Sequence, residues 1–128
     1  MTVRAVRGAI QVDRDEENHL IDSVRTLLKR VMHANGLLSD DLISVVFTAT
    51  PDLTSVFPAA AARELGLVDV PLMCAQELDI DSALPRTVRV LAHVETSRAR
   101  RDIQHVYLGG AAVLRQDLAR TEKGSVSR

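Results

Sequence analysis

Arginines inside predicted strands are the residues of this sequence whose type and placement best suggest chemistry. Arg89 lies between Val88 and Val90 in an alternating segment, and Arg7 ends the first predicted strand. A charged side chain among apolar neighbours is costly unless it meets an anion, and the guanidinium group matches the geometry of carboxylates. If the two strands are neighbours, Arg7 and Arg89 can bind one small anion together. For an arginine taken singly, a solvated or salt-bridged surface role is the commoner explanation.

Other catalytic groups form weaker patterns. Cys74 ends an apolar strand without a histidine nearby in the sequence, so a buried or substrate-facing thiol is the preferred interpretation over a nucleophile. Glu77 and Asp79 are close together but belong to no cluster of metal ligands, and Asp79 and Asp81 suit a turn. The four histidines are scattered, and the sequence has no glycine-rich phosphate-binding loop. The residues therefore predict no metal site.

The composition restricts the class of protein. The chain has 128 residues, of which 46% are hydrophobic and 2% aromatic, so we expect one domain with an aliphatic core. We assign this domain to residues 1–120 and expect a flexible tail at 121–128. The net charge of -1 argues against nucleic-acid or anionic-membrane partners, and the excess of arginine (14 Arg, 2 Lys) is explained equally well by genomic base composition. One cysteine, no signal peptide and no long apolar segment predict a cytoplasmic protein.

Hydrophobic periodicity predicts the elements that must position these residues. Residues 2–12 favour a strand that closes near Gly8, and an amphipathic helix follows, with a capping-box-like start at Asp13 and Glu16 and an end at Asn35-Gly36. Four further strands are expected at 42–48, 68–74, 87–96 and 103–108, short helical segments at 58–65 and 111–118, and loops at 76–85 and 97–102. The fold class is therefore α+β, a mixed sheet of about five strands with one long helix and short helical segments.

One long helix can cover only one face of such a sheet. In segment 87–96, the apolar side chains at 88, 90, 92 and 94 share one face, and Arg89, Leu91, His93 and Glu95 share the other. An apolar sheet face without a helix needs a partner, and copies of the same chain are the simplest one. We therefore expect a closed homo-oligomer, which sedimentation as a monomer at micromolar concentration would contradict.

Six ordered blocks of the sequence resemble the monofunctional chorismate mutases that form a trimeric pseudo-α/β-barrel. The blocks are VRAVRGA (3–9), TATPDLTSVFPA (48–59), ARELG (62–66), VPLMCAQELD (70–79), RVLAHVET (89–96) and HVYLGGAAVLRQDL (105–118). They keep the order and spacing of the family from end to end. The resemblance implies a homotrimer with active sites at subunit boundaries, and conversion of chorismate to prephenate without a cofactor.

The resemblance also implies roles for individual residues. Arg89 is implied at the ether oxygen of chorismate and Glu77 against the ring, and these two form the expected catalytic pair. Arg7 and Tyr107 are implied to bind carboxylate oxygens, and Cys74 to support the substrate hydroxyl and Glu77. The other implied substrate-binding residues, some of them from the neighbouring subunit, are Met73, Ala75, Gln76, Phe57, Ala59, Arg63, Leu114 and Arg115.

One position departs from the family pattern, and three other classes of protein fit parts of the sequence. Ala60 stands where many members have a lysine, which weakens attraction of the dianion unless Arg63 compensates. The alternatives are a small trimeric imine or enamine deaminase, a non-catalytic carboxylate binder and a structural oligomer. The Pro-Ala-Arg-Ser type run of the deaminases is absent from this sequence. Glu77 argues against the other two, because a carboxylate repels a dianion unless the chemistry requires it.

Overall fold

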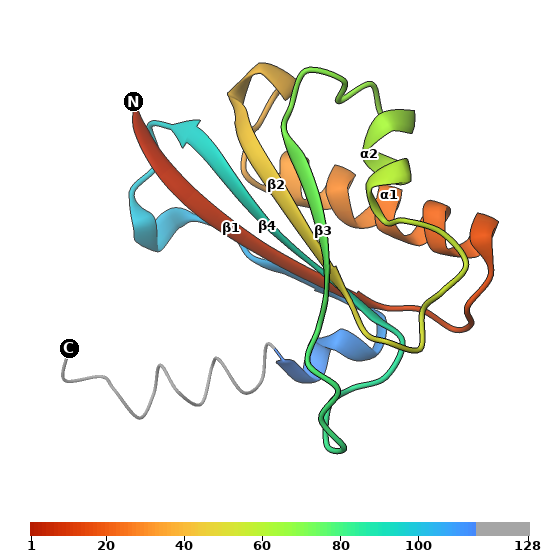
Figure 1. Ribbon diagram of the computed structural model, residues 1–128. Helices are drawn as coiled ribbons and strands as arrows, with labels where there is room; N and C mark the ends of the chain where they lie inside the picture. Colours follow the sequence, from red (N-terminus) through yellow and green to blue (C-terminus); the bar gives the residue numbers. More distant parts are fainter. Residues whose placement is uncertain (115–128) are drawn as a thin grey trace, which may run out of the picture.

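A mixed five-stranded sheet is the framework of the computed structural model, which describes residues 1–114 (Figure 1). The strands are β1 (Thr2–Gln11), β2 (Leu42–Ala49), β3 (Leu72–Gln76), β4 (Thr87–Thr96) and β5 (Val106–Leu108), in the spatial order β3-β2-β4-β1-β5. β4 is antiparallel to both β1 and β2, whereas β3 is parallel to β2 and β5 is parallel to β1. The expected mixed sheet of about five strands is confirmed.

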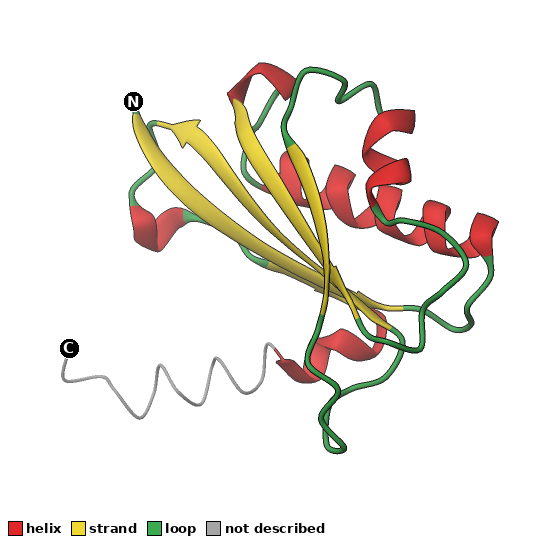
Figure 2. Ribbon diagram, in the orientation of Figure 1, coloured by secondary structure: helices red, strands yellow, loops and turns green. Residues whose placement is uncertain are grey.

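Two α-helices cover one face of this sheet, as Figure 2 shows. The long helix is α1 (Glu17–Ala34) and the short one is α2 (Ala59–Glu64); single 3-10 turns occur at η1 (Ser39–Asp41), η2 (Arg100–Asp102) and η3 (Gly109–Ala111). Glu16 caps α1 by accepting a hydrogen bond from the N–H of Asn18, so the helix begins at Glu17, four residues after Asp13. It ends where the sequence predicts, with Gly36 at a φ of +61°, a conformation that glycine adopts without steric cost.

The core between the helices and the sheet is aliphatic. The helix contributes Leu20, Val24, Leu27, Leu28 and Val31, all buried, and the facing strands contribute alternate residues. In β4, positions 88, 90, 92 and 94 are buried and the residues between them are partly or fully exposed. This alternation is the one predicted from the period of two in a strand.

The first strand is longer than predicted, and Gly8 does not end it. β1 continues to Gln11, which places Arg7 in the middle of the strand. A Cβ built on Gly8 would lie 3.0 Å from a methyl group of Val90 and 3.1 Å from one of Val31. The glycine is therefore required by the close approach of α1 to the sheet, and the prediction of a strand end at this residue was wrong.

Two other predicted strands have different bounds. The strand expected at 68–74 is β3 (Leu72–Gln76), because its parallel pairing begins beyond Pro71, whose carbonyl accepts from the N–H of Val45. The strand expected at 103–108 is only β5 (Val106–Leu108), because Ile103 closes the turn η2 by donating its N–H to Arg100. The helical segment expected at 111–118 lies only partly within the described residues. The tail expected at 121–128 lies entirely outside them.

The other face of the sheet carries exposed apolar side chains. Val3 is 56% exposed, Met73 is 64% exposed and Leu91 is 37% exposed. We call this side, which carries the odd-numbered residues of β1 and β4, the open face. Within residues 1–114, no helix is long and apolar enough to span a lipid bilayer.

Candidate active site

Arg7 and Arg89 lie on neighbouring strands and line the same cavity. In the antiparallel pair β1/β4, Ala9 is opposite Arg89 and Arg7 is opposite Leu91, so both guanidinium groups belong to the open face. The cavity has a volume of about 400 Å³, and Tyr107 and Leu114 also line it. The sequence left open whether the two strands are neighbours. They are, and their pairing places two cations and a phenol around one hollow.

A single rung of the sheet explains this grouping. The strand register aligns Ala75, Thr48, Arg89, Ala9 and Tyr107 across all five strands. Ala9 lies between Arg89 and Tyr107 on this rung, and its small side chain lines the cavity. The cavity thus follows from residue size along one rung as much as from the strand order.

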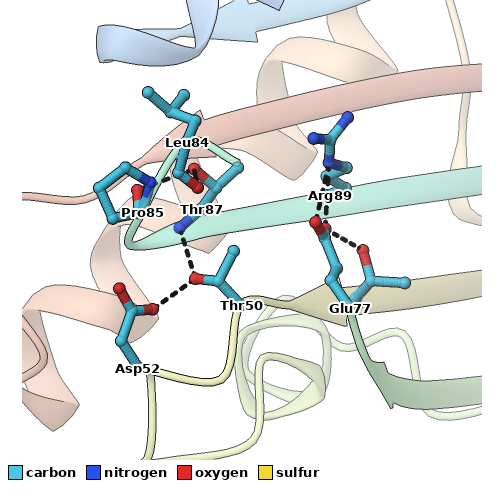
Figure 3. A network of polar contacts seen from close by, with 8 residues as sticks. Thr50, Asp52, Glu77, Leu84, Pro85, Thr87 and Arg89 are labelled. Atoms are coloured by element: carbon cyan, nitrogen blue, oxygen red, sulfur yellow. Dashed lines mark hydrogen bonds and ion pairs between the residues drawn. The ribbon is translucent and has the colours of Figure 1, made fainter. Parts of the chain in front are cut away.

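Arg89 is paired with Glu77, as Figure 3 shows. The Nε of Arg89 lies 3.0 Å from Oε2 of Glu77 and 3.2 Å from Oε1. The Glu77 side chain is 15% exposed and that of Arg89 is 43% exposed, so the carboxylate is the more enclosed partner. The pairing uses Nε, and the two terminal nitrogens of the guanidinium point away from Glu77 (Figure 3). Because Arg89 also lines the 400 Å³ cavity, these nitrogens are available to a ligand there.

Glu77 follows the last residue of β3 and is held by the neighbouring strand β2. Its backbone N–H donates to the carbonyl of Ala49 at 2.9 Å, which extends the ladder by one residue. The hydroxyl of Thr48 donates to Oε2 of Glu77 at 2.6 Å. Sequence reasoning missed Thr48, because only the register between β2, β3 and β4 brings it to Glu77.

A separate polar network fixes the beginning of β4, two residues before Arg89 (Figure 3). The Thr50 hydroxyl donates to Asp52 and accepts from the N–H of Thr87 at 3.0 Å. The same carboxylate accepts from the backbone N–H of Arg86, whose φ of +49° is unusual for a residue with a side chain. The Thr-Pro-Asp turn therefore has a structural role. Through Thr50 and Asp52 it holds the loop 77–86 against the end of β2 and sets the start of β4, the strand that carries Arg89.

Phe57, Cys74, Ala75 and Gln76 line a second cavity of about 540 Å³, beside the edge strand β3. Cys74 is opposite Phe47, a fully buried residue, and packs against the core on the helix-covered side. Its side chain is therefore on the other side of the sheet from Arg89. Met73 is on the open face opposite Val46, and Phe57 is 71% exposed. Phe57, Cys74, Ala75 and Gln76 therefore line a different cavity from Arg89, and Met73 lines neither of the two.

The remaining predicted site residues are in the segment around α2 and at the end of the described chain. Arg63 is exposed on α2, whereas Ala59 is 4% exposed and belongs to the core of its own subunit. Ala60 is half-buried beside it. Arg115 lies outside the described residues. Among residues 1–114, no group of three or more His, Cys, Asp or Glu side chains is arranged to hold a metal ion.

Asp15 fixes the loop that leads to Phe57. One carboxylate oxygen accepts from the N–H and the hydroxyl of Thr54, at 3.0 and 2.9 Å, and the other accepts from the N–H of Ser55 at 3.0 Å. The Ser55 side chain, followed by the Thr54 backbone N–H, holds the pKa of Asp15 below its ordinary value. The carboxylate thus ties the loop 50–58 to the residues that precede α1.

Comparison with known proteins identifies the family. The sequence profile of chorismate mutase type I matches residues 3–118. The chain is 45% identical over 117 residues to the chorismate mutase AroH of Thermus thermophilus, covering 91% of this chain and 96% of that protein. It is 40% identical over 123 residues to the chorismate mutase AroH of Bacillus subtilis, covering 95% and 97%. A solved chorismate mutase from Clostridium thermocellum superposes with a TM-score of 0.84 at 43% identity, over 85% of this chain and 97% of that one.

Two arginines and a tyrosine line one hollow, and a carboxylate fixes one of the arginines, so the arrangement defines a site for a small carboxylic acid. The extent of the matches is decisive for the family, because they cover nearly the whole chain and nearly the whole of each relative. The chain belongs to the chorismate mutase type I family. It is an isomerase of aromatic amino acid biosynthesis that converts chorismate to prephenate.

Proposed function

We propose that Arg89 and Glu77 carry the rearrangement and that Arg7 and Tyr107 bind the carboxylates of chorismate. The observation that supports this most strongly is the ion pair, in which Glu77 holds Arg89 through Nε and leaves its two terminal nitrogens for the ligand. Arg7 and Tyr107 line the same cavity as Arg89. Arg7 is two residues along β1 from Ala9, the partner of Arg89, and Tyr107 is opposite Ala9 in β5. The site thus offers Arg7 and the phenol of Tyr107 to the carboxylates and leaves the second cation, Arg89, for the ether oxygen.

The chemistry requires orientation and charge stabilisation only. Chorismate rearranges in one unimolecular step, in which the C–O bond of the enol ether breaks as a C–C bond forms. Negative charge develops at the ether oxygen, where the terminal nitrogens of Arg89 supply fixed donors. Positive character develops on the ring, where the carboxylate of Glu77 is favourable. Binding of both carboxylates by Arg7 and Tyr107 selects the compact reactive conformer, which is an effect of proximity.

We also propose that the protein is a homotrimer and that each site is completed by a neighbouring subunit. The exposed apolar side chains of the open face, Val3, Met73 and Leu91, need a partner to cover them. β3 is an edge strand, and the exposed Phe57 and Arg63 come from the segment beside it. Docking of that segment against the open face of the next subunit brings Phe57 and Arg63 to the cavity of Arg89. Cys74, Ala75 and Gln76 then contribute through the exposed edge of β3.

The activity is tested by mixing the purified protein with chorismate and following the loss of chorismate optically. Acidification of the product and detection of phenylpyruvate then reports prephenate. Loss of chorismate with formation of phenylpyruvate is the expected result. Tight binding without loss indicates a carboxylate binder, and release of ammonia from an imine substrate indicates a deaminase; either result contradicts the proposal.

Subunit complementation tests the shared site. Arg63→Ala and Arg89→Lys subunits are each expected to form impaired trimers. In randomly mixed trimers, about a quarter of the sites combine an intact Arg89 from one subunit with an intact Arg63 from the next. Co-refolding the two variants should therefore restore a corresponding fraction of the wild-type turnover. Activity that stays at the level of the separate variants would show that Arg63 and Arg89 do not act in a site shared between subunits.

A further inference from the structure

Thr48 is at the centre of the rung that builds the candidate site. It is opposite Arg89 on one side, in the antiparallel pair β2/β4, and opposite Ala75 on the other, in the parallel pair β2/β3. Its side chain belongs to the open face and lines the 400 Å³ cavity. It is therefore next to both members of the Arg89–Glu77 pair, although 29 residues separate it from Glu77.

The contact between Thr48 and Glu77 is short and directed. The hydroxyl oxygen lies 2.6 Å from Oε2 of Glu77, as is typical of a hydroxyl that donates to a carboxylate. Arg89 approaches the same carboxylate through Nε alone, at nearly equal distances from its two oxygens. A single nitrogen shared by both oxygens fixes where the carboxylate group lies but leaves it free to rotate about its bond to the side chain. The hydroxyl of Thr48 donates to Oε2 only, so it distinguishes the two oxygens and fixes this rotation.

Fixing this rotation matters because Glu77 is just outside regular structure. β3 ends at Gln76, and the backbone N–H of Glu77 makes one further ladder bond, to Ala49. Beyond it, the chain enters the loop 77–86, in which Leu78 is 80% exposed and Ile80 is 56% exposed. The side chain of Glu77 is consequently ordered by its contacts with β2 and β4, and Thr48 is the contact from β2.

We propose that Thr48 is a positioning residue of the isomerase: its hydroxyl sets the orientation of the Glu77 carboxylate, and through it the orientation of the Arg89 guanidinium. This inference rests on the proposed roles of Glu77 and Arg89. Thr48 does not need to touch the substrate for this role, because its hydroxyl proton is committed to Glu77. Any small hydroxyl at this position can act in the same way, whereas an isosteric methyl group cannot.

The test compares Thr48→Val with Thr48→Ser. Valine keeps the shape and suits a half-buried strand position, so the fold should be retained; Thr48→Ala is a second variant without the hydroxyl. We expect Thr48→Val to lower kcat by about tenfold, the effect of losing one hydrogen bond to a charged group, with KM changed less than threefold. Thr48→Ser should recover most of that loss. Thr26→Val, on the exposed side of α1, is the matched control and should leave kcat unchanged.

Glu77→Gln separates this inference from the roles on which it rests. If Thr48 acts through Glu77, the Thr48→Val change costs much less in the Glu77→Gln background than in the wild type. An equal cost in both backgrounds would show that Thr48 acts directly on the substrate and would overturn the inference, as would a serine variant as slow as the valine variant. A Glu77→Gln enzyme with wild-type turnover would instead remove the proposed role of Glu77 itself.

Discussion

The two faces of the sheet follow the same alternation of side chains but differ in what covers them. On the covered face, the side chains at 88, 90, 92 and 94 of β4 pack against helices of the same chain and are buried. On the open face, Arg89 and Leu91 of the same strand remain half-exposed or exposed. The covered face is thus completed within one chain. The open face carries the polar groups of the candidate site and exposed apolar area that the chain itself does not cover.

This difference separates stability from chemistry along a single strand. Residues two apart share a face and residues one apart do not, so a substitution in β4 falls either on the covered face or on the open face. Substitutions on the open face should therefore change turnover or assembly, and substitutions on the covered face should change the free energy of unfolding.

Arg89→Lys should have the largest effect, on the open face. Lysine keeps the positive charge but loses the fork of donors, so it cannot both pair with Glu77 through Nε and present two terminal nitrogens to the ether oxygen. We expect turnover to fall more than a hundredfold, the range found when a directed donor to developing negative charge is removed. Steady-state kinetics with chorismate measures the loss.

The control for this prediction is Arg101→Lys, an exposed arginine in η2. It should keep both turnover and the melting temperature. Circular dichroism should show that Arg89→Lys is folded, because the change is on the face that the core does not use. Turnover of Arg89→Lys close to that of the control would remove Arg89 from the catalytic role.

Leu27→Ala should have a large effect of the opposite kind, on the covered face. Leu27 is fully buried and lies against Gly8 in the contact between α1 and β1. Its truncation leaves a cavity and should lower the free energy of unfolding by about 3 kcal/mol. Below the melting transition, kcat should stay within about twofold of the wild type, because no group of the candidate site moves. A strong loss of kcat in fully folded protein would show that the two faces are coupled.

Most of the fold could be predicted from the sequence because it is set by local patterns. The helix Glu17–Ala34 and the alternation in Thr87–Thr96 depend on periods of 3.6 and 2 that one segment displays by itself. The prediction of a strand end at Gly8 was wrong because a glycine is needed there to make room for Val31 and Val90, which are far away in the sequence. The bounds of β3 depended on its pairing with β2 in the same way, and those of β5 depended on the turn η2 that precedes it.

The candidate site could be predicted only in part, for the same reason. Arg89 and Arg7 are visible because charge among apolar residues is itself a signal. Glu77 came from the resemblance to a family, and Thr48 was missed, because a threonine in a strand is ordinary until the register places it 2.6 Å from a carboxylate. The side of the sheet on which Cys74 lies likewise required the pairing of β2 with β3.

Val3→Asp should have a moderate effect that tests what covers the open face. Val3 is 56% exposed and is opposite Glu95, so the substitution adds a second negative charge to a surface we propose to be buried between subunits. The trimer should weaken, and specific activity should become dependent on protein concentration. Sedimentation velocity measures the assembly. Val68→Asp, a 76% exposed residue in the loop before β3, is the control and should leave the assembly unchanged. A concentration-independent trimer in both variants would place the subunit contact elsewhere.

Asp15→Asn should have the smallest effect, because it acts on the loop 50–58 that connects β2 to α2. The loop ends in the exposed Phe57 and is tied to Asp15 by hydrogen bonds from Thr54 and Ser55. Because these contacts hold the pKa of Asp15 below its unfolded value of about 3.9, their stabilising contribution is complete above that pH and is lost as the pH falls through the folded pKa. The variant should therefore melt a few degrees lower at neutral pH, and the difference from the wild type should shrink in increasingly acidic buffer. Melting curves between neutral and acidic pH measure it, and a difference that grows toward low pH would reverse the sign assigned to Asp15.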